Sequence, residues 1–215
     1  MTWPALFQSA DILPALGWAT VAYAIGCWAT GYYLVRIRTG RDIREIGSGS
    51  TGARNVGRVL GRGGFWLTVL GDFAKGALVV FAARHFTGNN QFAALAMLFV
   101  VVGHIWPAPL HWRGGKGVVT SGGAMVIYDM QLALAYGAAF ALGFAFTRRT
   151  TFPGLAGFLV LPFVSFWLHH SPFETTVVAA LAALILFAHR QNIMEAFPAL
   201  AGRRGLSAKP QHTKS

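Results

Sequence analysis

The chain has 215 residues, of which 54% are hydrophobic and only 12% are charged, and its formal net charge is +11. Soluble domains carry about 25% charged residues, so this composition excludes an ordinary soluble domain and indicates a polytopic membrane protein. Nucleic acid is not an expected partner, because most basic residues lie in short loops between apolar stretches.

Seven apolar stretches are predicted to form membrane-spanning helices. In chain order they are residues 12–35, 65–83, 92–102, 118–128, 132–146, 152–168 and 177–188. The fourth covers only about 16 Å at 1.5 Å per residue, so it either takes length from the preceding loop or that loop dips into the membrane. We predict an all-α membrane protein with one seven-helix domain, residues 1–197, and a disordered basic tail, residues 198–215.

The basic residues predict the orientation of the chain. Residues 36–62, 109–117, 147–151 and the tail from 189 hold 16 of the 18 Lys and Arg residues. With seven spans, these segments share one side. The positive-inside rule places them in the cytoplasm, so the N-terminus is expected outside and the C-terminus in the cytoplasm.

Residues 47–58 form the first stretch that predicts chemistry. Its glycines let backbone N–H groups approach a ligand closely, and Ser48, Ser50 and Thr51 add hydroxyl groups. Arg58 adds a planar cation suited to phosphate. The stretch lacks the Gly-Lys-Ser or Gly-Lys-Thr ending of a nucleotide-binding P-loop. It predicts an anion site; taken alone, a flexible linker is the alternative.

A second glycine-rich stretch follows the third span. Pro107 and Pro109 are predicted to end that helix. Gly-Gly-Lys-Gly at 114–117 then precedes the next helix, whose N-terminal N–H groups would face a bound anion. The alternative is an ordinary basic loop.

Two further polar stretches lie on the same side, and one ionisable pair lies inside a span. Topology alone explains Arg148 and Arg149, whereas Thr151 either caps the sixth helix or bonds a substrate. Residues 189–192, His-Arg-Gln-Asn, end the last span and predict a polar site, although basic residues there need no function. Asp72 and Lys75, spaced i, i+3, are either functional or a structural ion pair.

Three of these stretches resemble one family in order and spacing. Residues 42–61 with 72–76, the Gly-His-x-Trp-Pro…Gly-Gly-Lys-Gly stretch at 103–117 and His-Arg-x-Asn-Ile at 189–193 resemble the bacterial acyl-phosphate:glycerol-3-phosphate acyltransferase family, PlsY. The resemblance implies transfer of a fatty acyl group from acyl phosphate to the 1-hydroxyl of sn-glycerol 3-phosphate. The products are lysophosphatidic acid and phosphate, in phospholipid biosynthesis at the bacterial inner membrane.

The resemblance also implies the partners and the site. No metal or cofactor is expected; the partners are the two substrates, membrane lipid and the enzyme that forms acyl phosphate. The implied catalytic residues are Ser48, Arg58, Lys116, His189 and Asn192. The implied substrate-binding residues are Gly47, Gly49, Ser50, Gly52, Arg54, Asn55, His104, Gly114, Gly115, Gly117 and Thr151.

Three residues depart from the family pattern: Ser50 stands where asparagine is usual, Arg54 where threonine is usual and Thr151 where a serine is expected. The last stretch also continues differently, with Met-Glu-Ala-Phe at 194–197 and Ala-Gly-Arg-Arg at 201–204. These departures leave open a same-fold acyltransferase with a different alcohol acceptor. A membrane anion-binding or transport protein is the alternative from another class, and a polar path through Asp72 and Lys75 would favour it.

Overall fold

The computed structural model describes residues 11–196, and all regular structure within that range is helical. The α-helices are α1 (Ile12–Gly26), α2 (Thr30–Thr39), α3 (Ala53–Thr87), α4 (Asn90–Ile105), α5 (Val118–Tyr128), α6 (Met130–Thr147), α7 (Thr151–Trp167), α8 (Pro172–Ala188) and α9 (Arg190–Ala196). Two short 3₁₀ helices, η2 (Ile43–Glu45) and η3 (Ala108–Leu110), lie in the connections. The predicted disorder of residues 198–215 lies outside the described residues.

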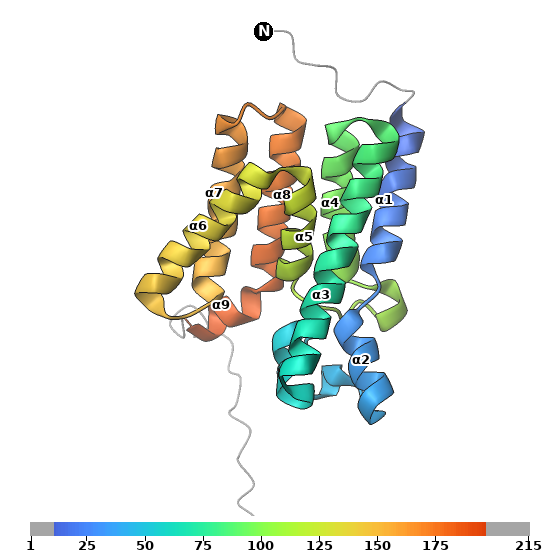
Figure 1. The fold of residues 1–215 in the computed structure, drawn as a ribbon, viewed down its shortest axis with the longest axis vertical. Coiled ribbons are helices and arrows are strands. Elements are labelled where there is room, and N and C mark those ends of the chain that lie inside the picture. Colours follow the sequence, from blue (N-terminus) through green and yellow to red (C-terminus); the bar gives the residue numbers. More distant parts are fainter. Residues whose placement is uncertain (1–10, 197–215) are drawn as a thin grey trace, which may run out of the picture.

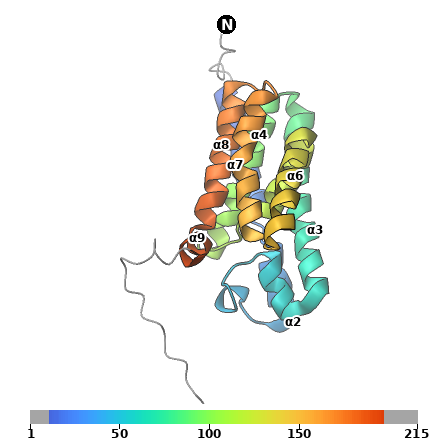
Figure 2. The same cartoon turned by 90° about the vertical axis from the view of Figure 1, so that its left-hand side faces the viewer.

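The long helices run side by side in one bundle (Figure 1). α3 packs on α5 and α4, α1 packs on α4, and α6 packs on α7. α7 in turn packs on α8, and α8 on α4, which joins the two groups. Figure 2 shows that α2, the start of α3 and α9 all lie at the same end of the bundle. The basic and glycine-rich stretches are therefore gathered at one end.

Two buried clusters hold this arrangement. The larger lies between α3, α4, α5, α7 and α8 and includes Met97, Phe158 and Leu181, each fully buried. The smaller consists of Val35, Ile43 and Val56, so it fixes α2, η2 and the first turn of α3 to one another. It therefore supports the end of the bundle where the first glycine stretch lies.

Glycines allow the short helix α5 to lie directly against α3. A Cβ atom on Gly76 of α3 would overlap the carbonyl of Thr120, and one on Gly123 of α5 would overlap the carbonyl of Phe73. Close backbone approach at small residues is typical of helix packing in membranes, where packing rather than water exclusion drives association. It fixes α5 and the glycine loop that precedes it.

The structure supports a multi-pass membrane protein. Four helical stretches of the described part are long and apolar enough to cross a bilayer: Ile12–Thr39, Ala53–Thr87, Asn90–Leu110 and Met130–Thr147. α8 and α9 would make a fifth if they form one span bent by 56°. α5 and α7 are apolar but shorter. Large apolar side chains such as Phe146 and Phe166 are about four-fifths exposed (82% and 78%), as expected of surfaces that face lipid.

The first predicted span, residues 12–35, lies within one stretch that is long and apolar enough to cross a bilayer, Ile12–Thr39, but this stretch is broken between α1 and α2. Ala29 takes an extended conformation, which frees carbonyl groups at the end of α1. The Lys75 ammonium donates to the carbonyls of Gly26, at 3.2 Å, and Trp28. The ammonium group of a lysine on α3 therefore satisfies the carbonyl groups freed at the break.

A second difference concerns the first glycine stretch. The sequence analysis placed residues 36–62 between two spans and began the second span at residue 65, but α3 already begins at Ala53, with Gly52 as its N-cap residue. Arg54, Asn55 and Arg58 therefore lie on the first turns of a helix. α3 kinks at Gly61, whose φ of 69° suits glycine.

Candidate active site

Asn55 organises the first glycine loop. Its side-chain amide nitrogen donates to three backbone carbonyls, those of Ile43 (3.2 Å), Ile46 (2.8 Å) and Ser50 (3.0 Å). Its oxygen accepts the N–H of Ser48 at 3.1 Å, and the residue is only 2% exposed. The structure thus gives Asn55, predicted to bind substrate, a role in holding the loop.

Local backbone conformation also explains the glycines of this loop. Gly47 and Gly49 have φ values of 59° and 67°, which side chains rarely adopt. The Ser50 hydroxyl accepts the N–H of Gly52 at 3.2 Å. Ser48 remains exposed, and Arg58 Nη1 lies 3.8 Å from where a Cβ of Gly47 would stand. The loop therefore presents Ser48 beside a cation.

Arg44 ties this loop to the second one, a role that the sequence analysis missed. Its guanidinium pairs with Asp42 at 2.6 Å and donates to the carbonyl of Leu110 at 2.5 Å. Hydrogen bonding from Arg44 holds the pKa of Asp42 below its usual value. The Thr51 N–H also donates to the Gly114 carbonyl at 3.4 Å. The sequence signal was that Arg44 lies within residues 42–61, shortly before the glycine stretch.

The second glycine loop lies on His104. The Gly115 N–H donates to the His104 carbonyl at 3.1 Å. A Cβ on Gly114 would overlap that carbonyl, and one on Gly115 would overlap the His104 Nε2 atom. These glycines therefore meet a packing requirement of the protein itself.

His104 was predicted to bind substrate, but it is buried beneath this loop. Its Nδ1 atom accepts from the Lys75 ammonium at 2.9 Å, and Lys75 pairs with Asp72 at 3.1 Å. All three side chains are at most 6% exposed. Together with the bonds from Lys75 to the α1 carbonyls, these contacts favour the structural interpretation of the Asp72–Lys75 pair.

Lys116 joins the second stretch to the last one. Its ammonium donates to the side-chain oxygen of Asn192 on α9. Burial lowers the pKa of Lys116, and the charge of Arg54 acts in the same direction, while Glu195 opposes both. The three ionisable groups are therefore neighbours.

His189 ends α8 nearby and is buried. Its Nδ1–H donates to the Ile185 carbonyl at 2.8 Å, which leaves Nε2 as the acceptor of the ring. Burial lowers the pKa of His189, which favours the neutral imidazole.

Thr151 is neither the cap residue nor a capping group. Thr150 is the N-cap residue of α7, and its side chain makes no capping hydrogen bond. Both hydroxyl groups accept instead from Arg54, Thr150 at 2.6 Å and Thr151 at 3.3 Å. Of the two alternatives for Thr151, capping of this helix is excluded, because the helix begins at residue 151.

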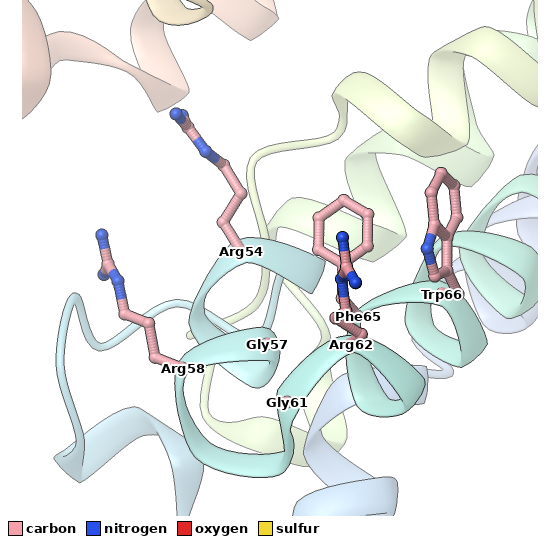
Figure 3. A pocket seen from close by; sticks show the side chains of 7 residues that line it. All are labelled: Arg54, Gly57, Arg58, Gly61, Arg62, Phe65 and Trp66. Carbon is pink, nitrogen blue, oxygen red and sulfur yellow. The ribbon is translucent and has the colours of Figure 1, made fainter.

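Two cavities open on either side of Arg54. The first, of about 490 Å³, is lined by Arg54, Gly57, Arg58, Gly61, Arg62, Phe65 and Trp66. Figure 3 shows the arginines of this cavity projecting from successive turns of α3, with Arg62 near the two aromatic rings. The second, of about 400 Å³, is lined by Arg54, Arg148, Arg149, Thr150, Thr151, Phe152 and Asn192. Both are strongly cationic, so both suit anions.

Ten of the sixteen predicted residues fall into two groups, whereas Ser48, which is exposed, and His189, which is buried, line neither of the two cavities. Arg54, Arg58, Thr151 and Asn192 line the cavities, with Lys116 bonded to Asn192. Asn55, His104, Gly114, Gly115 and Gly117 support the loops from within, Gly117 as the N-cap of α5 with a φ of 82°. Within residues 11–196, no three His, Cys, Asp or Glu residues are grouped as metal ligands.

The fold and this end of the bundle define a helical integral membrane protein with strongly cationic cavities at one end. The family model described as glycerol-3-phosphate acyltransferase matches residues 16–198. The glycerol-3-phosphate acyltransferase 1 of Desulfitobacterium hafniense is 44% identical over 195 residues, which cover 90% of this chain and 94% of that protein. The glycerol-3-phosphate acyltransferase of Gloeobacter violaceus is 38% identical over 184 residues, 83% of this chain and 89% of that protein.

The solved structures agree. PlsY, an integral membrane glycerol 3-phosphate acyltransferase, superposes in its glycerol 3-phosphate form with a TM-score of 0.78 at 27% identity, covering 91% of this chain and 96% of that one. Its lysophosphatidic acid form gives a TM-score of 0.75 at 26% identity, covering 89% and 94%. The chain belongs to the glycerol-3-phosphate acyltransferase family, and the resemblance predicted from the sequence is confirmed.

Proposed function

We propose that this protein transfers a fatty acyl group from acyl phosphate to the 1-hydroxyl of sn-glycerol 3-phosphate. The observation that carries the proposal is that residues from three separate stretches meet at one end of the bundle. Lys116 bonds Asn192, and Arg54 reaches the α6–α7 loop. Two phosphate-bearing substrates need such a set of cations.

In this reaction the acceptor hydroxyl oxygen attacks the carbonyl carbon of acyl phosphate. The new C–O ester bond forms, the bond from that carbon to the phosphate oxygen breaks, and inorganic phosphate leaves with the hydroxyl proton. The protein supplies orientation and charge stabilisation. Ser48, Arg58, Lys116 and Asn192 hold glycerol 3-phosphate, with His189 beside them, and the two glycine loops hold acyl phosphate through backbone N–H groups.

We further propose seven spans in the bacterial inner membrane, with the N-terminus outside and the site in the cytoplasm. Six of the seven apolar stretches fall largely within one helix each, and the first is divided between α1 and α2. α5 and α7, although short, are apolar. The basic residues at the site end support the orientation. Residues 1–197 act as one catalytic domain followed by the basic tail, and the enzyme that forms acyl phosphate is the partner that supplies the donor.

The experiment is phosphate release by purified protein in lipid, given palmitoyl phosphate with and without sn-glycerol 3-phosphate. The proposal requires release that depends on glycerol 3-phosphate and yields lysophosphatidic acid. Lys116→Ala, folded but inactive, is the matched control. If phosphate release does not depend on glycerol 3-phosphate but depends on another alcohol, that alcohol is the acceptor. If folded protein releases no phosphate, acyl phosphate is not the donor.

A further inference from the structure

Arg54 occupies a place that no other requirement of the fold explains. It is an exposed residue on the first turn of α3, and it lines both cavities. In the first cavity its neighbours are arginines and aromatic rings. In the second they include Asn192, which bonds Lys116.

Two threonines hold its guanidinium in place. Nη2 donates to the Thr150 hydroxyl at 2.6 Å and Nη1 to the Thr151 hydroxyl at 3.3 Å. A threonine at an N-cap position usually accepts a backbone N–H from the first helical turn. Thr150 makes no such bond, so its hydroxyl is committed to Arg54 at the expense of its own helix.

These partners orient Arg54 without neutralising it. A guanidinium has five N–H donors in a fixed plane, and the two threonines use two of them. Hydroxyl groups carry no charge, and the ion pairs found within residues 11–196 do not include Arg54. The remaining N–H groups and the whole positive charge are therefore left for a ligand between the two cavities.

We infer that Arg54 is a specificity-determining contact for the phosphate group of the acyl acceptor, and that Thr150 and Thr151 are its positioning residues. The acceptor is favoured over the donor because the cavity that Arg54 shares with Asn192 is lined, apart from Phe152, by hydroxyl, amide and cationic groups. The first cavity adds Phe65 and Trp66, which suit a lipid tail. The inference rests on the proposed function and narrows it: the acceptor carries a phosphate, and neutral alcohols are poor substrates.

The test compares Arg54→Thr, Arg54→Lys and the double variant Thr150→Val/Thr151→Val with wild type. Arg38→Thr removes one exposed positive charge from α2 and is the control for general electrostatic attraction. Protein in phosphatidylcholine nanodiscs is titrated with sn-glycerol 3-phosphate by calorimetry. The KM and kcat for glycerol 3-phosphate and for neutral glycerol are then measured.

Arg54→Thr is expected to raise the Kd and KM for glycerol 3-phosphate about tenfold, since charge-assisted bonds to phosphate are lost, and to lower the preference for glycerol 3-phosphate over glycerol by a similar factor. The threonine double variant should raise both about threefold, Arg54→Lys should recover part of the loss, and Arg38→Thr should change little. An equal effect of Arg54→Thr and Arg38→Thr would overturn the inference, as would a fall in kcat with Kd unchanged.

The calorimetry separates this inference from the proposed reaction. If wild-type protein binds glycerol 3-phosphate through Arg54 but forms no lysophosphatidic acid, the proposed reaction is refuted and the inference about Arg54 is supported. If wild-type protein forms lysophosphatidic acid but Arg54→Thr leaves the Kd for glycerol 3-phosphate unaltered, the reaction is supported and the inference about Arg54 is refuted.

Discussion

Replacing Asn55 with alanine should open the first glycine loop while leaving the bundle folded. The side chain bonds four backbone groups between Ile43 and Ser50, and it is buried at the base of the loop. Its two amide N–H groups are shared among three carbonyls, so we count about three effective hydrogen bonds. At ~0.5–1.5 kcal/mol each, less some recovery by water in a half-exposed loop, the loss is about 2–3 kcal/mol.

That free energy predicts the rate at which loop amides exchange with solvent. Since about 1.4 kcal/mol is a factor of ten, exchange over residues 43–52 should accelerate roughly 30- to 150-fold, with little change in the core of α4. Hydrogen–deuterium exchange with mass spectrometry, on protein in lipid, measures this directly. Asn55→Asp should be at least as damaging, because a carboxylate donates nothing to the three carbonyls and repels them.

Ser48→Ala is the matched control. Asn55 accepts the backbone N–H of Ser48 and not its hydroxyl, so this variant should keep wild-type exchange while losing activity. Wild-type exchange in Asn55→Ala would refute the argument that this side chain holds the loop. Faster exchange in Ser48→Ala would show that the hydroxyl also supports it.

Three other changes follow from the same geometry. Gly115→Ala should lower the free energy of unfolding by about 1–3 kcal/mol and raise the KM for glycerol 3-phosphate, because its Cβ would overlap the buried ring of His104. Gly122→Ala is the control: open space surrounds this glycine, so neither the melting temperature nor the KM should change. Asp42 has a lowered pKa, so its stabilisation is complete above its ordinary value of 3.8 and is lost as the pH falls through the lower folded value; Asp42→Asn should remove that acid dependence from a pH series of melting temperatures. Burial lowers the pKa of Lys116, so KM for glycerol 3-phosphate should rise on the alkaline side before pH 10.5, and Lys116→Arg should shift that rise to higher pH.

The helices could be predicted because hydropathy along the chain decides them. The break at residues 27–29 could not, because its cause lies elsewhere in the sequence. Lys75, which lies almost fifty residues further along the chain, donates hydrogen bonds to the freed carbonyls, and no local sequence pattern predicts that contact. The start of α3 was also missed, since its first turn looks like part of a glycine loop.

The location of the site was predicted from motif order and charge. Which residues support the loops and which face the cavities was not predicted. Asn55 and His104 have the chemistry of ligand-binding residues, and a sequence gives no means of telling that both are turned inward. The role of Arg44 depends on where the Leu110 carbonyl lies, which only the folded chain shows. Motifs therefore predict which residues gather, while burial decides which of them support and which remain available.

The partners of the cations show how this division serves binding. In the scaffold, cations are paired with acids: Arg44 with Asp42, and Lys75 with Asp72. At the cavities, Arg54 is held by threonine hydroxyls and Lys116 by an amide oxygen. Glu195 lies near enough to raise the pKa of Lys116, but within residues 11–196 no acid forms an ion pair with Arg54 or Lys116. Such a pair would have cancelled the charge, and a phosphate would have had to displace the acid. Neutral partners fix the geometry beforehand and leave the charge for the substrate, which is what electrostatic preorganisation requires.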